Sequence, residues 1–150
     1  VPGGGTSFIR ARAAIEKMKE FKAVFGKAAQ SEDLSADEVG RVKYDYAAGL
    51  NVVYQALGVP LRTIADNAGV KGAVVVSKVA ENKSANFGFN ALTEEYGDLV
   101  EMGVITPAKV DRLALQNAAS VATVLLTADC IVTEKPEPKG EHKHDHAHAH

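Results

Sequence analysis

Residues 86–106, NFGFNALTEEYGDLVEMGVIT, place the tightest limits on what this chain can fold into. Aromatic residues and glycines are interleaved there with an acidic cluster, which is too irregular a pattern for a plain helix. The alternating run Phe87-Gly88-Phe89 before Asn90 is typical of a short extended hairpin arm. Thr106 followed by Pro107 then supplies an N-cap and a first-turn proline, so a helix is expected beyond them.

Helical periodicity dominates the first part of the chain. Apolar residues at near-helical spacing predict a helix from Thr6 to about Ala29. Ser35 and Glu38 form a capping box for a second helix, which is predicted to run to about Ala56. The second helix is expected to bury the following residues or their neighbours: Val39, Val42, Tyr46, Leu50, Val53 and Leu57.

Gly58 and Pro60 punctuate the chain after the second helix. Glycine ends that helix, and proline suits the first turn of a new one, for which Gly69 is the expected C-terminal cap. Residues 71–80, KGAVVVSKVA, are rich enough in β-branched side chains to form a strand, although a helix is also compatible with them. Residues 127–133 alternate enough to predict a short terminal strand. The helix after Pro107 is expected to bury Val110, Leu113, Ala114, Ala118, Val121, Ala122 and Leu125.

The composition is that of an ordinary globular protein. Apolar residues make up 46% of the 150 residues, charged residues 24%, and the net charge of -2 argues against a nucleic-acid partner. No apolar run is long enough to span a bilayer, and no signal peptide begins the chain, so we expect no membrane partner and a cytoplasmic location. The single cysteine, Cys130, fits a reducing compartment.

Three segments together carry a resemblance to a known family. They are the glycine triplet at residues 3–5, the stretch 86–106, and residues 114–122 with the sequence ALQNAASVA. In these segments the chain resembles the group I chaperonins, the GroEL-type 60 kDa folding machines, over most of residues 1–134. The resemblance implies a mainly α fold for residues 1–134. This would be the C-terminal helical half of an equatorial, ATP-binding domain, with a small β-hairpin, a short C-terminal strand and a helix at residues 71–80. The chain also begins inside the glycine motif, so we expect a truncated chain.

The resemblance further implies a role in protein folding. The parent protein would assemble as a homo-oligomeric ring, enclose non-native polypeptides with a co-chaperonin, and use ATP with Mg²⁺. This half would supply the adenine and ribose side of the nucleotide site and contacts within the ring. The phosphate-gripping loop and catalytic aspartates of the family are not encoded here, so no catalytic residue is assigned and the chain should not turn over ATP alone.

Two glycines are candidate nucleotide-binding residues. A glycine turn before a helix can bring backbone N–H groups and the positive end of the helix dipole close to an anion. In the family this turn lies against ATP, which favours that role for Gly3 and Gly4. Without the resemblance, a plain flexible turn would be the better interpretation, and Gly5 is interpreted as a packing or turn residue.

The resemblance assigns the remaining candidate residues to the adenine base and the ribose of the nucleotide. Asn90 matches the family's asparagine at the adenine, where an amide offers both a donor and an acceptor, and Ala91 and Leu92 would add backbone and apolar contacts. Val104 takes the place of the apolar residue that stacks on adenine. Thr106 stands where relatives usually have an aspartate that binds the ribose, and its hydroxyl could instead cap the following helix.

The acidic residues of the stretch 86–106 and the histidine-rich residues 135–150 could suggest metal binding, but other interpretations are also considered for each. The acidic residues of the central stretch have no histidine beside them, so a solvated or subunit-contact surface is favoured over a metal site, and no metal ligand is assigned. Residues 135–150 are predicted to be a disordered tail whose alternating histidines could bind Zn²⁺, Ni²⁺ or Cu²⁺. The alternative function is therefore a nucleotide-independent helical interaction or metal-binding module derived from a chaperonin. The acidic residues are Glu94, Glu95, Asp98 and Glu101, and the histidines are His142, His144, His146, His148 and His150.

Overall fold

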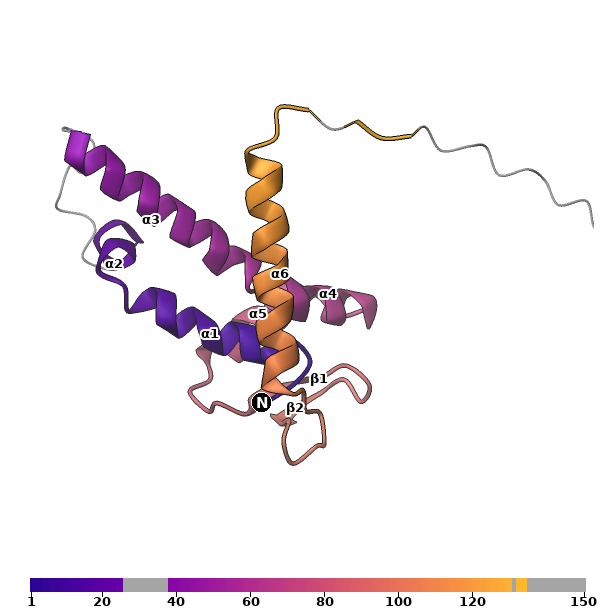
Figure 1. The fold of residues 1–150 in the computed structure, drawn as a ribbon. Helices are drawn as coiled ribbons and strands as arrows, with labels where there is room; N and C mark the ends of the chain where they lie inside the picture. Colours follow the sequence, from indigo (N-terminus) through magenta and orange to yellow (C-terminus); the bar gives the residue numbers. More distant parts are fainter. Residues whose placement is uncertain (26–37, 131, 135–150) are drawn as a thin grey trace, which may run out of the picture. The chain divides into compact units, whose positions relative to one another are not determined.

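The structure is a computed structural model that describes residues 1–25, 38–130 and 132–134 (Figure 1). The chain divides into two compact units, Val1–Leu115 and Gln116–His150. The predicted tail at residues 135–150 lies outside the described residues. The mainly helical class with a small antiparallel hairpin is confirmed.

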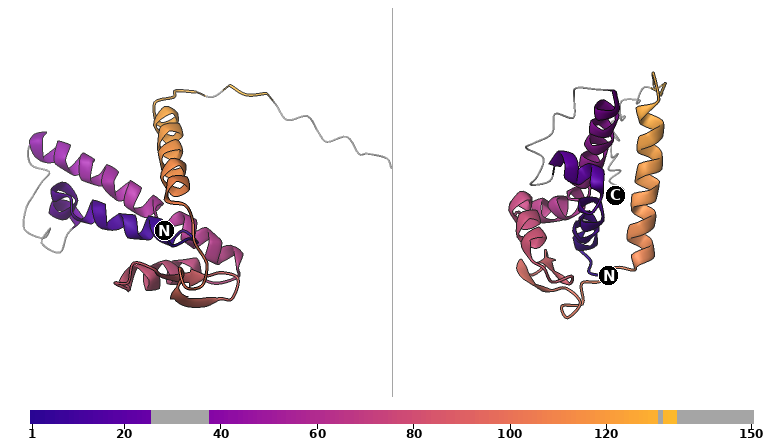
Figure 2. Two further views of the ribbon diagram at one scale, coloured as in Figure 1. Left: turned by 60° about the horizontal axis from the view of Figure 1, so that its bottom comes forward. Right: turned by 90° about the vertical axis from the view of Figure 1, so that its left-hand side faces the viewer.

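The first predicted helix is two helices in the structure, α1 (Thr6–Glu16) and α2 (Lys19–Phe25). Met18 donates its backbone N–H to the carbonyl of Ile15 at 3.0 Å, a tight turn after which the helix starts again. The break lets Phe21 reach Ile15 and Leu57 in a buried cluster, and α2 packs along α3 (Glu38–Ala56), as Figure 2 shows. Prediction of one continuous helix was therefore wrong, and residues 26–29 lie outside the described part.

The helix α3 ends where the sequence predicted, and its inward face follows the predicted one, with Ala47 and Tyr54 packed inward in place of their neighbours Tyr46 and Val53. Ala47 is fully buried, and Leu50 and Tyr54 pack against the cluster around Phe21. The spacing of apolar residues along α3 did not decide which of two neighbouring residues points inward. Packing against α1 and α2 decides it. Leu50 and Leu57 are confirmed at the core, whereas the expected residues Val42, Tyr46 and Val53 are exposed. The capping residue Ser35 and the side chain of Val39 lie outside the described part.

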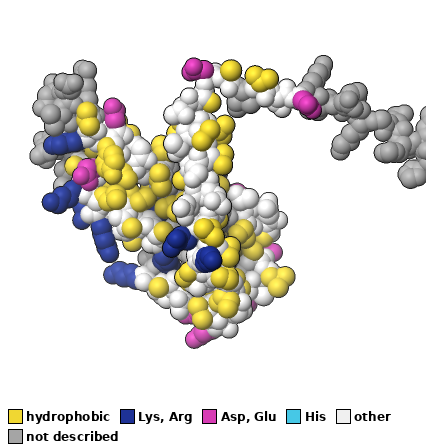
Figure 3. Space-filling view, in the orientation of Figure 1, with side chains coloured by type: hydrophobic (Ala, Val, Ile, Leu, Met, Phe, Trp, Pro, Cys, Tyr) yellow, Lys and Arg dark blue, Asp and Glu magenta, His cyan; other side chains and the backbone are white. Residues whose placement is uncertain are grey.

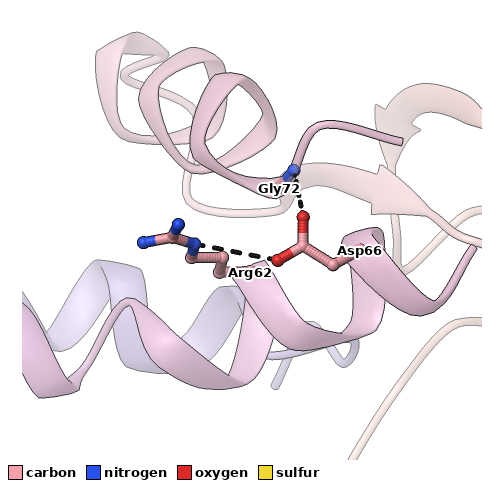
Figure 4. Close-up of polar contacts among 3 residues, drawn as sticks. All are labelled: Arg62, Asp66 and Gly72. Carbon is pink, nitrogen blue, oxygen red and sulfur yellow. Dashed lines mark hydrogen bonds and ion pairs between the residues drawn. The ribbon is translucent and has the colours of Figure 1, made fainter. Parts of the chain in front are cut away.

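The next two helices, α4 (Val59–Asn67) and α5 (Gly72–Glu81), are those predicted, and residues 72–81 are helix rather than strand. Gly69 adopts a left-handed φ of 81° after α4, as expected of a C-terminal cap. The carboxylate of Asp66 accepts the Gly72 N–H at 2.8 Å, so one side chain of α4 caps the start of α5 (Figure 4). A Cβ at position 72 would lie 2.4 Å from the carbonyl oxygen of Arg62, so the close approach of the two helices requires glycine there.

The hairpin pairs β1 (Phe87–Asn90) with β2 (Glu95–Asp98) in antiparallel register, Phe89 facing Tyr96 and Asn90 facing Glu95. Phe89 is 1% exposed, and its ring joins the main core of the first unit. The predicted extended arm is thus confirmed, and its alternation brings every second side chain to the core. The other buried members of that core are Ile9, Leu61, Ala65, Val75 and Val79.

The last helix, α6 (Ala108–Leu126), starts directly after Pro107 as predicted, but the burial expected for it was wrong. None of its side chains is buried, and Figure 3 shows hydrophobic side chains at the surface along this helix and along α3. The predicted terminal strand is also missing: residues 128–130 and 132–134 have no strand conformation, since no partner for it exists in the described part. None of the helices in the described residues has the length and hydropathy needed to cross a membrane.

The cap on α5 is a testable contribution to stability. Replacing Asp66 with alanine leaves the Gly72 N–H without its acceptor, and loss of such a cap costs about 1 kcal/mol. We expect Asp66→Ala to lower the urea midpoint, measured by circular dichroism at 222 nm. Asp66→Asn is the matched control, because it keeps an oxygen acceptor and should cost clearly less; equal losses for the two variants would contradict the cap.

The exposed side chains of α6 predict self-association. Val121 is 60% exposed and Leu125 is 54% exposed, and clusters of exposed apolar side chains of this kind promote contact between molecules. We expect sedimentation at micromolar concentration to detect oligomers that the double substitution V121S/L125S shifts toward monomer. V74S removes a valine of α5 with similar exposure, 57%, and should leave the distribution unchanged. A sharp wild-type monomer with strongly protected amides over residues 107–125 would refute the prediction.

Candidate functional site

The first three residues pair with the segment that precedes α6. The Gly3 N–H donates to the carbonyl of Val104 at 2.9 Å, and the Thr106 N–H donates to the carbonyl of Val1 at 3.0 Å. The terminal ammonium of Val1 donates in turn to the Thr106 carbonyl at 3.1 Å, and Pro2 and Ile105 form an antiparallel bridge. These bonds bring residues separated by about a hundred positions into one small antiparallel pair, which defines the candidate site.

The glycine turn fits closely against this pair. A Cβ on Gly3 would lie 3.0 Å from Oγ1 of Thr106 and 3.2 Å from the Val104 carbonyl, so the threonine hydroxyl faces the bare glycine backbone. Gly4 has a left-handed φ of 60° and passes by the carbonyl of Phe89, the residue before Asn90. A backbone with φ in this region favours glycine. At Gly4 this conformation lets the chain pass close to residues 104–106 and to the end of β1.

Gly5 is a packing residue, as the sequence indicated. It is the N-cap of α1 with a left-handed φ of 79°, and a Cβ there would lie only 2.6 Å from the Leu61 nitrogen. The backbone of α4 therefore touches the start of α1 directly. This contact fixes the direction in which α1 leaves the candidate site.

Asn90 stands at the end of β1 and is half-buried. Its side-chain oxygen Oδ1 accepts the Leu92 N–H at 3.0 Å, which is the local turn bond that asparagine commonly makes. The amide nitrogen Nδ2 has no hydrogen bond among the described residues, so it is the group left to meet a ligand. Ala91 packs on the main core, and Leu92, at 92% exposed, projects into solvent.

Val104 and Thr106 are half-buried on the strand-like segment beside Gly3. The Thr106 hydroxyl makes no hydrogen bond to the first turn of α6 in the described structure. The cap expected for α6 is thus not made by Thr106, and its hydroxyl remains beside Gly3. A hydroxyl without a bond to the helix is suited to a polar ligand such as a sugar hydroxyl.

The predicted site residues therefore fall into two groups. Gly3, Gly4, Val104 and Thr106 come together directly, and Asn90 joins them through the contact of Gly4 with Phe89. The exposed side chain of Leu92 has no described contact with that group. The acidic residue Asp98 has a structural use, since its Oδ1 accepts the N–H groups of Val100 and Glu101 in the turn after β2.

Sequence reasoning missed two polar residues of α1 beside the site. Thr6 is fully buried, and its hydroxyl has no hydrogen-bond partner among the described residues. Arg10 donates to the carbonyls of Asn82, Ala85 and Phe87 and so anchors the start of β1. Their spacing of four residues puts both on one face of α1, which is the one signal in the sequence that could have linked them.

The glycine turn, the paired segment and the hairpin all lie within the residues that the model of one known family matches. The model of the TCP-1/cpn60 chaperonin family matches residues 1–136 of this chain. The chain belongs to the TCP-1/cpn60 chaperonin family. Membership covers all of the described elements, from α1 to α6.

A solved chaperonin structure has the same fold. The open-state monomer of a group II chaperonin from Methanococcoides burtonii superposes with a TM-score of 0.62 over 85% of the present chain, with 21% sequence identity. The chain spans 28% of the length of that chaperonin. At this identity the likeness concerns the fold, and the chaperonin subgroup is not decided by it.

The two left-handed glycines of the turn give a matched pair of substitutions. Alanine at either position adopts an unfavourable φ, which costs roughly 1–2 kcal/mol. At Gly5 the new Cβ also collides with the backbone of Leu61, whereas at Gly4 its nearest neighbour would be 3.5 Å away. We expect Gly5→Ala to lower the thermal midpoint clearly more than Gly4→Ala does. Equal midpoints would mean that α1 and α4 do not meet as closely as described.

Proposed function

We propose that this chain is the C-terminal part of the ATP-binding equatorial domain of a GroEL-type, group I chaperonin. In the full-length protein it supplies the adenine and ribose side of the nucleotide site and contacts within a homo-oligomeric ring. The parent protein is an ATP-dependent folding machine that encloses non-native polypeptides with a co-chaperonin in the cytoplasm. The nucleotide would be ATP with Mg²⁺.

The observation that carries this proposal is the pairing of residues 1–3 with residues 104–106. It gathers four of the residues that the family resemblance assigns to the nucleotide, although they lie at opposite ends of the first unit. A contact of Gly4 with the carbonyl of Phe89 adds Asn90 to the same neighbourhood. The subgroup rests on the sequence motifs, in particular the glycine triplet and the hairpin arm FGFN.

The residues of the site offer chemistry that suits a nucleoside. Asn90 has a free Nδ2 donor for a ring nitrogen of the purine, while its Oδ1 is held by the Leu92 N–H. Val104 presents an apolar side chain for the face of the base, and the Thr106 hydroxyl can donate to or accept from a ribose hydroxyl. Gly3 is packed against Thr106, whereas the half-buried Gly4 carries no side chain, so a ligand can approach the backbone there at the start of α1.

The role of the chain in ATP turnover is limited to binding and orientation. Hydrolysis needs groups that hold Mg²⁺ and position the attacking water, and the proposal assigns those groups to the remainder of the full-length protein. The buried hydroxyl of Thr6, which has no partner in the described part of the chain, lies one residue beyond the glycine turn. Catalytic residues are not assigned to this chain.

Thr106 provides the direct test. In the full-length protein, Thr106→Asp should tighten ATP binding, because a charged acceptor strengthens a hydrogen bond to ribose by on the order of 1 kcal/mol. Calorimetric titration of ATP measures the change. Thr63→Asp is the matched control, since it adds the same charge at an exposed position of α4 and should leave the affinity unaltered. Unchanged or weaker ATP binding by Thr106→Asp would refute the ribose contact.

A further inference from the structure

A cavity separate from the proposed nucleotide face is lined by residues of four helices. They are α1, the end of α3, α4 and α5. Its volume is about 210 Å³, and its polar lining comes from Arg12, Gln55 and Arg62. The remaining lining is apolar or glycine, including Gly58, the N-cap of α4. Among the described residues no carboxylate lines this cavity, so the charged groups of its lining are the two guanidinium groups.

Arg12 places a buried positive charge in the lining of the cavity, because its side chain is charged and the residue is only 8% exposed. Its Nε donates to the carbonyl of Tyr54 at 2.9 Å, and its guanidinium carbon lies 4.5 Å from the centre of the Tyr54 ring. The hydroxyl of Tyr54 donates to Glu16 at 2.9 Å. Burial and this hydrogen bond raise the pKa of Tyr54, so the ring stays neutral under Arg12 at neutral pH.

The terminal nitrogens of Arg12 are turned toward Gly58. A Cβ on Gly58 would lie 2.2 Å from Nη2, so a glycine is needed for the guanidinium to rest beside the start of α4. The backbone N–H groups at that helix end carry a partial positive charge. The Tyr54 carbonyl offsets part of the charge on Arg12, but within the described residues no carboxylate forms an ion pair with it.

Arg62 faces the same cavity from α4. Only its Nε approaches Asp66, at a long 3.7 Å, and Figure 4 shows its two terminal nitrogens pointing away from that carboxylate. Asp66 is already engaged by the Gly72 N–H. Within the described residues, the terminal nitrogens of both arginines have no hydrogen-bond partner, and guanidinium groups prefer the paired oxygens of an oxyanion.

We propose that this cavity binds a small free oxyanion of the size and charge of inorganic phosphate. Arg12 holds the anion from the buried side, and Arg62 holds it from the open side. The site shares none of its lining residues with the proposed nucleotide face. It is independent of the function proposed above.

Calorimetric titration of inorganic phosphate into the 150-residue chain tests the proposal, with chloride keeping the ionic strength constant because salt screens surface charge. We expect saturable binding of one phosphate per chain. Arg62→Met should weaken it by at least about tenfold, since a charge-assisted hydrogen-bonding partner is lost. Arg12→Met should abolish phosphate binding, but it removes a buried side chain and can also disturb the fold. The Arg62 side chain is 63% exposed, so Arg62→Met keeps the fold and provides the test in either case.

Arg112→Met is the matched control, because it removes an exposed arginine of α6 and should bind phosphate as the wild type does. Circular dichroism of each variant confirms that the fold is kept. Two results would overturn the proposal: wild-type protein that takes up no phosphate saturably in the millimolar range, or equal weakening by Arg62→Met and Arg112→Met. The second result would indicate general attraction of anions to the surface.

Discussion

The first unit depends on one half-buried side chain, Arg10. Its guanidinium donates to the carbonyls of Asn82 at 2.7 Å, Phe87 at 2.8 Å and Ala85 at 3.2 Å, and so it ties α1 to the end of α5 and to the first residue of β1. Burial lowers the pKa of Arg10, yet an arginine stays protonated throughout the physiological range, so this clamp does not switch with pH. The neighbouring Ile9 enters the main core at the same place, and polar and apolar contacts therefore hold the same three segments.

The candidate site is a consequence of this arrangement. Because α1 is held by Arg10 from one side and touches Leu61 through Gly5 from the other, the glycine turn before it has a fixed position. The turn can then pair with residues 104–106 and pass the end of β1. The cavity lined by Arg12 and Arg62 lies on the opposite side of α1, where the Arg12 guanidinium stacks on the Tyr54 ring. One helix thus separates a surface rich in bare backbone from a cavity rich in positive charge.

Local signals in the sequence predicted most of the elements, and long-range contacts explain the errors. Gly58, Pro60 and Gly69 placed α4 correctly because caps act within one turn of the helix. The break after Glu16 was missed because no glycine or proline marks it, and it exists for the packing of Phe21. The inward face of α3 was predicted only to within one residue for the same kind of reason. At the site, family resemblance assigned Gly3 and Thr106 to the nucleotide, but their contact with each other was not predicted. Thr6, Arg10 and Arg12 had no pattern that distinguishes them from solvent-facing or core residues.

The pairing of Val1 with Thr106 has a consequence for how the chain reaches its fold. The two residues are separated by 105 positions, so their bonds close nearly the whole first unit into a loop. The entropy lost on closing so long a loop has to be offset by contacts formed inside it. The hairpin and the α4–α5 pair consist of short-range contacts, whereas the proposed nucleotide face consists of long-range ones. Topology therefore makes that face a late product of folding, assembled after the helices and hairpin that surround it.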